Sequence, residues 1–323
     1  MVWQAIWSEG RAWRKPRVDG GAMLQGLTLD LEFVVPDRAR RRLGDVPMRL
    51  WDGASGPGSA TAIYLMPKGA LRLIHQDFDI KTPDGFAEGR ETLSLRYVAS
   101  FHADEGLFEV NNRDRGFVHS EATGTVATLN LLDALPRADA FLGVAHVVGI
   151  ASCALGSMER PGGIESGAIV ATPEGPRPVD GLRAGDEILD ADGEIHLLQR
   201  VEVEDRLCLG RAAPLRLRAP YFGLARDVIV TPGTRLLQTG PAVEYLCGSE
   251  RVLAEANDLI GGNAICRDMR LAVRKMFHLS SETAMCMRVE GCALELPSDL
   301  RVDVPVLDRP AAQAVLSAYG RAA

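Results

Sequence analysis

The first half of the chain contains short segments in which apolar and polar positions alternate. In the stretch 27–35, leucine and phenylalanine side chains fall on one face, and Asp30 and Glu32 fall on the other. A period of two is typical of a β-strand whose two faces meet different surroundings. Glycine, proline and aspartate punctuate the segments, as they do between paired strands. This pattern predicts an antiparallel β-sandwich over residues 1–150. The same alternation recurs at 61–66, 70–75, 92–101 and 106–110.

The second half also contains strand-like segments, separated by closely spaced turn residues. Ile169 and Val170 lead into a turn at 173–175, and further β-branched and leucine residues follow at strand-like spacing up to Leu189. The full string at 167–193, GAIVATPEGPRPVDGLRAGDEILDADG, closely resembles the opening of the Hint (hedgehog/intein) domain in its bacterial subgroup. The resemblance implies a horseshoe of β-strands over residues 167–308.

Three later segments resemble further parts of the same family and follow in the family's order. Residues 213–237 resemble the central segment, in which a strand ends in a Thr/Ser-x-x-His motif. Residues 250–265 resemble the helix and strand that usually come next, and residues 276–296 resemble the closing strand pair. Together with the opening motif, these segments indicate that the resemblance extends over most of the second half of the chain.

The residues that carry the family's self-processing chemistry are replaced. Family members place a cysteine four residues before the first glycine of the opening motif, and its thiol starts an N–S acyl shift. This chain has Gly163 at that position. Thr231 takes the place of the threonine in the central motif, and Thr234 stands where the family has histidine. The resemblance implies that these three residues and Thr172 line a vestigial pocket.

Neither replacement can supply the missing chemistry. Glycine has no side chain, and the threonine hydroxyl does not titrate near neutral pH, so no nucleophile and no general acid remain. We therefore expect no catalytic residue in this chain. The substitute nucleophiles nearest in sequence are Ser166 and Cys153, and each could attack only the carbonyl directly before it, because an acyl shift demands tight positioning.

Two further segments complete the predicted organisation. Residues 151–166 are small, glycine-rich and interrupted by Pro161, which predicts a linker between the two halves. Residues 309–323 have Pro310 near their start and contain alanine and leucine on one side, which predicts a short C-terminal helix. The predicted fold class is therefore all-β, with a β-sandwich, a Hint-like horseshoe and one terminal helix.

The N-terminal half resembles concanavalin-like, laminin-G-type sandwiches at 67–75 and 91–112. That resemblance implies a glycan, a cell-surface molecule or a protein as its partner. Oxygen-bearing side chains in the turns offer candidate calcium ligands, but aspartate and asparagine are also the commonest turn formers, so we expect no cofactor and no metal. These candidates are Asp77, Asp79, Asp84, Asn111, Asn112 and Asp114.

Composition narrows the function classes. The 323 residues include 36 Lys and Arg and 43 Asp and Glu, which gives a net charge of −7. No basic patch is interleaved with aromatic residues, so we expect no nucleic-acid partner.

No apolar run is long enough to span a bilayer, and the N-terminus lacks a signal-peptide pattern. Six cysteines without metal-binding spacing favour free thiols. Cytoplasmic residence is the default prediction; export without a signal and association with a particle are the alternatives.

Three functions compete on this sequence. The first is a non-catalytic binding or structural protein, in which a Hint domain without its nucleophile serves as a scaffold or interaction module. The second is a self-cleaving protein that uses Ser166 or Cys153 as a substitute nucleophile. The third is a surface-binding component of a phage-like particle. The pair of Gly163 and Thr234 separates the first two functions and favours the first.

Overall fold

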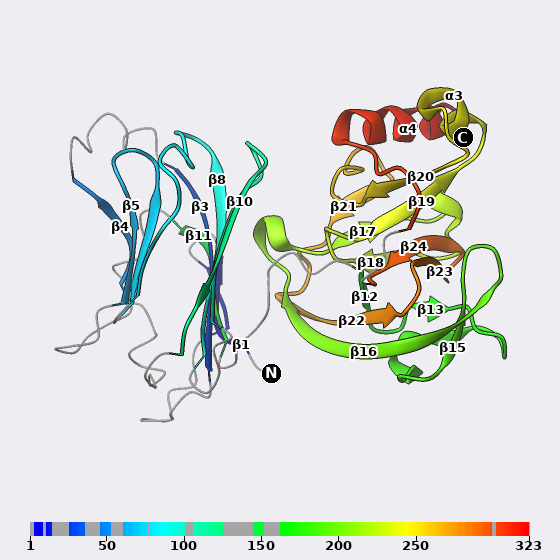
Figure 1. Cartoon of the computed structure of the whole chain (residues 1–323), viewed down its shortest axis with the longest axis horizontal. Helices are drawn as coiled ribbons and strands as arrows, with labels where there is room; N and C mark the ends of the chain where they lie inside the picture. Colours follow the sequence, from blue (N-terminus) through cyan, green and yellow to red (C-terminus); the bar gives the residue numbers. More distant parts are fainter. Residues whose placement is uncertain are drawn as a thin grey trace. The chain divides into compact units, whose positions relative to one another are not determined.

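The computed structural model describes residues 3–8, 11–14, 26–35, 46–52, 61–75, 78–100, 106–125, 145–151, 162–298 and 302–322 (Figure 1). The chain forms two compact units. The first contains Met1–Met158 with Leu209–Arg211, and the second contains Glu159–Cys208 with Ala212–Ala323. Most of the described secondary structure consists of antiparallel strands, which confirms the predicted all-β fold.

Within its described residues, the first unit contains a seven-stranded sheet in the order β10-β9-β8-β3-β11-β1-β2 and a four-stranded sheet in the order β4-β5-β6-β7 (Figure 1). The seven-stranded sheet is built from β1 (Trp3–Ser8), β2 (Arg11–Arg14), β3 (Gly26–Val34), β8 (Thr92–Ser100), β9 (Gly106–Asn112), β10 (Phe117–Thr123) and β11 (Ala145–Ala151). The four-stranded sheet is built from β4 (Met48–Asp52), β5 (Thr61–Leu65), β6 (Leu71–His75) and β7 (Phe78–Lys81).

One apolar core joins these two sheets into a sandwich. Leu29 and Phe33 of β3 are buried in it with Leu73 of β6, Tyr97 of β8 and Phe108 of β9. Alternate residues of β3 and β6 point to this core, as the period of two predicts. Full burial of each large apolar side chain contributes roughly 1.5–3 kcal/mol to the free energy of unfolding.

Asp30, on the opposite face of β3, is also buried, and an ion pair neutralises its charge. Asp30 accepts two hydrogen bonds from Arg96 of β8, 2.7 Å from Nε to Oδ1 and 2.6 Å from Nη2 to Oδ2. Both side chains are almost fully covered. The two residues are direct cross-strand partners, so the guanidinium meets the carboxylate in a bidentate arrangement. Asp30, one of the two acidic positions of the alternating pattern, is therefore part of the interior, whereas Glu32 is half-buried.

The described part of the second unit also holds two sheets. A seven-stranded sheet has the order β15-β16-β22-β12-β18-β17-β21, and a six-stranded sheet has the order β14-β13-β23-β24-β19-β20 (Figure 1). The first is built from β12 (Gly163–Glu165), β15 (Glu187–Leu189), β16 (Ile195–Leu207), β17 (Leu215–Leu217), β18 (Val228–Val230), β21 (Ile265–Arg267) and β22 (Val273–Ser281). The second is built from β13 (Ile169–Val170), β14 (Arg177–Pro178), β19 (Arg235–Thr239), β20 (Arg251–Glu255), β23 (Met285–Val289) and β24 (Cys292–Leu296).

Strand β16 is the longest in the second unit's sheets and curves along one side of the unit (Figure 1). It pairs with β22 from Leu207 opposite Val273 to Leu198 opposite Ser281, with a register shift between Leu198 and Arg200. A register shift of this kind bends a strand, and a horseshoe-shaped arrangement of strands needs such a bend. Strand β22 lies between β16 and β12, so the register of β22 determines which side chain lies opposite Gly163.

Helices are few among the described residues. Helix α3 (Pro241–Cys247) begins with proline at its first position and ends at Gly248 in the left-handed conformation. Helix α4 (Arg309–Ala322) buries Ala312 and Val315. Short 3-10 turns are formed by Val179–Gly181, Gly210–Ala212 and Tyr221–Gly223. No helix among the described residues combines the length and the hydropathy that a membrane crossing requires.

The structure differs from the sequence expectation at two places. The segment 151–166, predicted as a linker, ends in strand β12, because Gly163 and Ile164 pair with β22 in the sheet. The segment 250–265, predicted to be a helix followed by a strand, instead opens with strand β20; helix α3 precedes it, and β21 begins only at Ile265. Helix α4 lies where a C-terminal helix was expected.

Candidate functional site

The residue at the family's nucleophile position, Gly163, begins strand β12, which lies between β22 and β18 in its sheet. Gly163 is the cross-strand partner of His278, and Ile164 pairs with Phe277 on one side and Val230 on the other. Both β12 residues are buried. The peptide bond before Gly163 therefore lies at the entrance to a paired strand.

Thr231 forms hydrogen bonds with both the carbonyl and the N–H of Gly163. Its N–H donates to the Gly163 carbonyl at 2.8 Å, and its hydroxyl oxygen accepts from the Gly163 N–H at 3.1 Å. Thr231 follows directly after β18, whose three residues are all β-branched and buried. The side chain of Thr231 is fully buried, so its hydroxyl must be hydrogen-bonded within the protein.

A tight turn returns the chain from Thr231 to Thr234. Pro232 occupies the second position of the turn, and the Thr234 N–H donates to the Thr231 carbonyl at 3.0 Å. The two threonine hydroxyl oxygens lie 3.0 Å apart. Gly163, Thr231 and Thr234 thus lie together with His278 in what we call the threonine pocket.

The threonine pocket leaves no room for a side chain at position 163. A Cβ atom built on Gly163 would lie 2.5 Å from Thr231 Cγ2 and 2.7 Å from His278 Cε1. Both distances are well inside van der Waals contact between carbon atoms. A chain without a side chain here has no nucleophile at the position where the family's acyl shift starts.

His278 was not among the site residues predicted from the sequence. Its Nε2 lies 3.1 Å from Glu204 Oε2, and both side chains are buried. Because the imidazole N–H donates to the carboxylate, the ring is held in one orientation against Gly163. The Arg206 guanidinium lies 3.9 Å from the other Glu204 oxygen. The sequence places His278 in a segment where family members also carry a strand histidine, which predicted a structural role. Its position against Gly163 depends on the pairing of β12 with β22, which joins residues more than a hundred positions apart.

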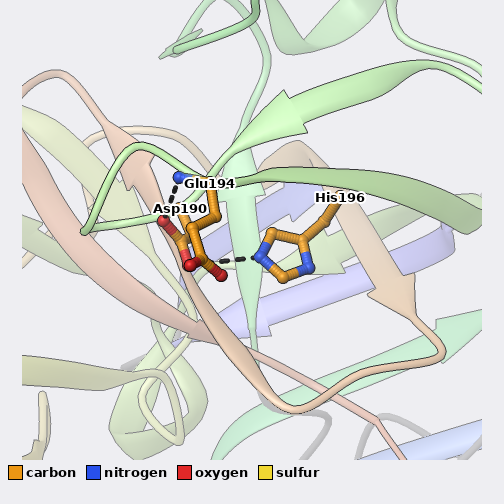
Figure 2. A group of neighbouring side chains, drawn as sticks. All are labelled: Asp190, Glu194 and His196. Atoms are coloured by element: carbon orange, nitrogen blue, oxygen red, sulfur yellow. Dashed lines mark hydrogen bonds and ion pairs between the residues drawn. The ribbon is translucent and has the colours of Figure 1, made fainter.

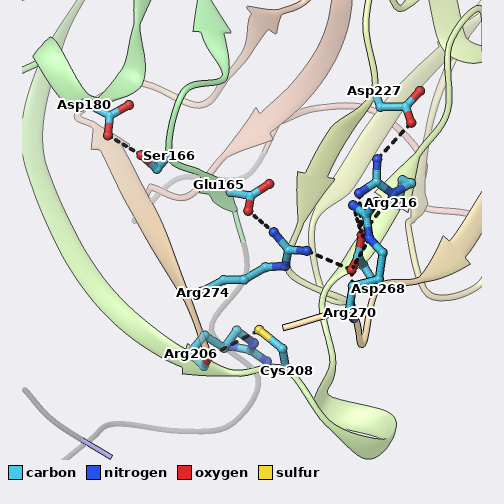
Figure 3. Close-up of polar contacts among 10 residues, drawn as sticks. All are labelled: Glu165, Ser166, Asp180, Arg206, Cys208, Arg216, Asp227, Asp268, Arg270 and Arg274. Carbon is cyan, nitrogen blue, oxygen red and sulfur yellow. Dashed lines mark hydrogen bonds and ion pairs between the residues drawn. The ribbon is translucent and has the colours of Figure 1, made fainter. Parts of the chain in front are cut away.

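The other predicted residues lie in different surroundings. Thr172 is buried, and its hydroxyl donates to the Gly175 carbonyl at 2.5 Å, which closes its own turn. Ser166 is exposed and donates a short hydrogen bond to Asp180 (Figure 3). Cys153 lies outside the described residues. The structure therefore brings Gly163, Thr231 and Thr234 together and gives Thr172 and Ser166 local partners.

A network of arginines and carboxylates surrounds the far end of β12 (Figure 3). Glu165 pairs with Arg274 of β22, and Arg274 Nη2 donates to Asp268 at 2.8 Å. Arg216 and Arg270 bind the same carboxylate at 2.5 and 2.8 Å. Asp268 is almost fully buried, so the three guanidinium groups compensate its charge. Cys208 lies beside this network, and burial raises the pKa of its thiol to about 12.

The candidate calcium ligands of the first unit have other partners. Asp79 pairs with Arg72, and Asp84 pairs with Lys81 at 2.7 Å. Asp114 accepts a hydrogen bond from the Thr92 N–H at 2.8 Å. Asn111 and Asn112 are the last two residues of β9 and are buried; the Asn112 amide donates to the Phe86 carbonyl at 2.8 Å. Asp77 lies outside the described residues.

Comparison with known proteins bears on the second unit. The family model described as Hint domain matches residues 164–297 and thus begins one residue after Gly163. No curated protein matches the chain.

Solved structures add three similar chains. The MchDnaB-1 intein is 14% identical, with 42% of this chain and 99% of the intein covered at a TM-score of 0.28. The bacterial intein-like domain from Clostridium thermocellum is 15% identical, with 42% and 98% covered at 0.30. The LG1-3 region of the laminin alpha2 chain is 8% identical, with 92% and 54% covered at 0.25. The family match confirms what the sequence motifs implied: residues 164–297 of this chain form a Hint domain.

Proposed function

We propose that this chain is a non-catalytic binding or structural protein. Its Hint domain does not process itself and serves as a scaffold or interaction module, while the β-sandwich binds a glycan or a protein. Folds persist readily after their chemistry is lost, because the chemistry depends on a few side chains and the fold depends on many.

The observation that carries this proposal is the filled space at Gly163. Loss of a nucleophile by substitution alone would leave a cavity where the side chain had been. Here Thr231 Cγ2 and the His278 ring occupy the place of a Cβ. In addition, both backbone polar groups of Gly163 are hydrogen-bonded to Thr231. The site is packed as part of the core rather than kept open for a reacting group.

The surroundings of Ser166 argue against its use as a substitute nucleophile. A serine needs an adjacent base to accept its proton. Its hydrogen-bond partner is Asp180, and the hydrogen bond from Ser166 holds the pKa of that carboxyl below its ordinary value. The Gly167 N–H also donates to Asp180, at 2.6 Å. A carboxylate stabilised in this way is a weak base, so it activates the serine poorly.

The test is the intact mass of the purified chain, measured with and without dithiothreitol at neutral pH. An acyl shift would leave the N-terminal part joined through an ester to Ser166 or a thioester to Cys153. The added thiol attacks that carbonyl, displaces the side chain and releases the N-terminal fragment as its own thioester, so the mass spectrum reports the chemistry directly. We expect a single species at 34.9 kDa under both conditions. Fragments that break between residues 150 and 168 would contradict the proposal. The variants Ser166→Ala and Cys153→Ala would then identify which residue had attacked.

The binding role assigned to the sandwich has support at edge strand β10. Phe117 and Val118 are exposed there, and the Arg115 guanidinium lies over the Phe117 ring at 4.6 Å from its centroid. An exposed aromatic ring at a sheet edge suits contact with a sugar ring or a protein side chain. Glycan-array binding is expected to fall in Phe117→Ala. The control Val46→Ala removes an exposed apolar side chain next to β4 and should retain binding.

A further inference from the structure

The hairpin that joins β15 to β16 brings three metal-ligating side chains together, away from the residues of the threonine pocket. Asp190 directly follows β15, Glu194 directly precedes β16, and His196 is the second residue of β16. One ligand atom from each side chain lies within 4.8 Å of the others (Figure 2). We infer that this hairpin binds one divalent transition-metal ion, with Zn²⁺ as the representative ion, through Asp190, Glu194 and His196.

The spacing of two ligand atoms fits a single small ion. His196 Nε2 and Asp190 Oδ2 are 3.2 Å apart. Zinc binds imidazole nitrogen and carboxylate oxygen at about 2.0–2.2 Å, so an ion at that distance from both atoms subtends roughly 100°. That angle is close to the tetrahedral value. The ion would replace the proton of the hydrogen bond that now joins His196 Nε2 to Asp190 Oδ2.

Outer hydrogen bonds hold both of these ligands in position. The other Asp190 oxygen, Oδ1, accepts from the N–H groups of Asp192 and Glu194, each at 2.8 Å. His196 Nδ1 lies 3.0 Å from the hydroxyl oxygen of Thr283. Contacts of this kind fix the orientation of a carboxylate or imidazole ligand before the ion arrives. Figure 2 shows Oδ2 and Nε2 facing one another as a result.

The charge and the donor types point to a transition metal. Two carboxylates and a neutral imidazole carry a charge of −2, which a divalent ion neutralises. An imidazole nitrogen among the ligands favours zinc and its neighbours over calcium and magnesium, which prefer oxygen alone. Glu194 is exposed, and the Asp190 and His196 side chains are 12% and 17% exposed, so an ion can enter from solvent. Asp192 pairs with Arg251 at 2.8 Å and is not counted as a ligand.

Calorimetric titration of the full chain with Zn²⁺ tests the inference. We expect one ion per chain in the wild type, and at least about tenfold weaker binding in His196→Ala, Asp190→Asn and Glu194→Gln. Asp190→Asn keeps an oxygen for the two backbone N–H groups, so the turn should remain folded, which circular dichroism checks. The control Glu187→Gln removes an exposed carboxylate from the same hairpin and should bind as the wild type does.

Two results would overturn the inference. The first is a wild type that shows no zinc binding at micromolar concentration. The second is binding that is equally strong in the three ligand variants and the wild type. Absorption of the Co²⁺-substituted chain gives an independent readout, because thiolate ligands produce intense charge-transfer bands that nitrogen and oxygen ligands do not. A thiolate band that persists in His196→Ala would assign the ion to cysteines and not to the hairpin.

Discussion

Gly163 illustrates how a single backbone position can define a whole pocket. Its carbonyl and N–H are both taken by Thr231, and the side where a Cβ would lie faces Thr231 Cγ2 and the His278 ring. The requirement for glycine comes from close approach, since the β12 backbone is an ordinary strand. Any substitution here must therefore move a buried neighbour.

This packing predicts the effect of Gly163→Ala. The added methyl group should destabilise the Hint domain by roughly 1–3 kcal/mol, because it overpacks a filled core. Thr231→Ser removes Cγ2 but keeps the hydroxyl, so part of that cost should disappear when both substitutions are present. Hydrogen exchange of peptides from β12 and β22 measures the change. Additive costs in the double variant would show that Cγ2 is not the obstacle.

The buried thiols make a second prediction at the residue scale. Burial raises the pKa of Cys208, Cys286 and Cys292 from the usual 9.0 to about 12. Since the thiolate is the reactive form, alkylation of these residues in the native protein should be about a thousandfold slower than for an ordinary cysteine. Cys247 and Cys266 are only half-buried and should label before these three. Peptide mapping after iodoacetamide treatment checks the order, and urea-unfolded chain is the control.

The composition of the threonine pocket was only partly predictable from the sequence. The positions of Gly163, Thr231 and Thr234 follow from motif spacing, because each belongs to a recognisable segment. His278 could not be identified in this way, since its place opposite Gly163 depends on strand register. A one-residue slip of β22 would have turned its side chain to the other face of the sheet.

At the scale of elements, Asp268 connects three strands of the larger sheet in the second unit. It follows β21 directly and binds Arg216 of β17 and Arg274 of β22 (Figure 3). Strands β17 and β21 have only three residues each, and β21 lies at the sheet edge. Charged side chains therefore supply much of the attachment that longer ladders of backbone hydrogen bonds supply elsewhere.

Asp268→Asn should accordingly loosen this edge of the sheet. Removal of the carboxylate charge leaves Arg274 buried, with only Glu165 as its acidic partner, and should cost about 3 kcal/mol. Asp227→Asn is the matched control, because Asp227 also binds Arg216 but is exposed; it should cost at most about 1 kcal/mol. Calorimetric unfolding and hydrogen exchange in β17 and β21 distinguish the two variants. Equal costs would mean that burial of Asp268 contributes nothing.

Five strands of the first unit were predictable because their apolar and polar residues alternate. The strand predicted at 27–35 corresponds to β3, and that at 70–75 corresponds to β6. Helix α3 escaped prediction because its seven residues, PAVEYLC, span too few turns for a helical period to show. The segment 250–265 was expected to begin with a helix because it resembles the family's usual helix and strand. In the structure the helix comes earlier in the chain, and pairing with β19 makes Arg251–Glu255 strand β20.

At the scale of the whole molecule, the two units can be followed separately. All four tryptophans, at positions 3, 7, 13 and 51, belong to the first unit, so tryptophan fluorescence reports on the sandwich alone. His75 is buried there against Tyr97, with ring centroids 5.5 Å apart. Burial lowers the pKa of His75 from 6.5 to about 4.

This lowered pKa predicts an acid-sensitive sandwich. Between pH 6.5 and about 4, the unfolded chain binds a proton at His75 and the folded chain does not. The contribution of His75 to stability therefore decreases as the pH is lowered through that window and stays constant below it. The loss should reach roughly 3 kcal/mol. Urea unfolding followed by tryptophan fluorescence at several pH values measures it. His75→Gln should remove this contribution, and the control His119→Gln should retain it; an unchanged slope in His75→Gln would refute the assignment.

The filled space at Gly163 also restricts the order in which mutations can accumulate. A cysteine introduced at position 163 while Thr231 and His278 keep their present places meets their atoms at 2.5 and 2.7 Å and disrupts the core before it can react. Replacements that shrink or displace Thr231 or His278 would therefore have to come before any side chain at position 163 could be accommodated.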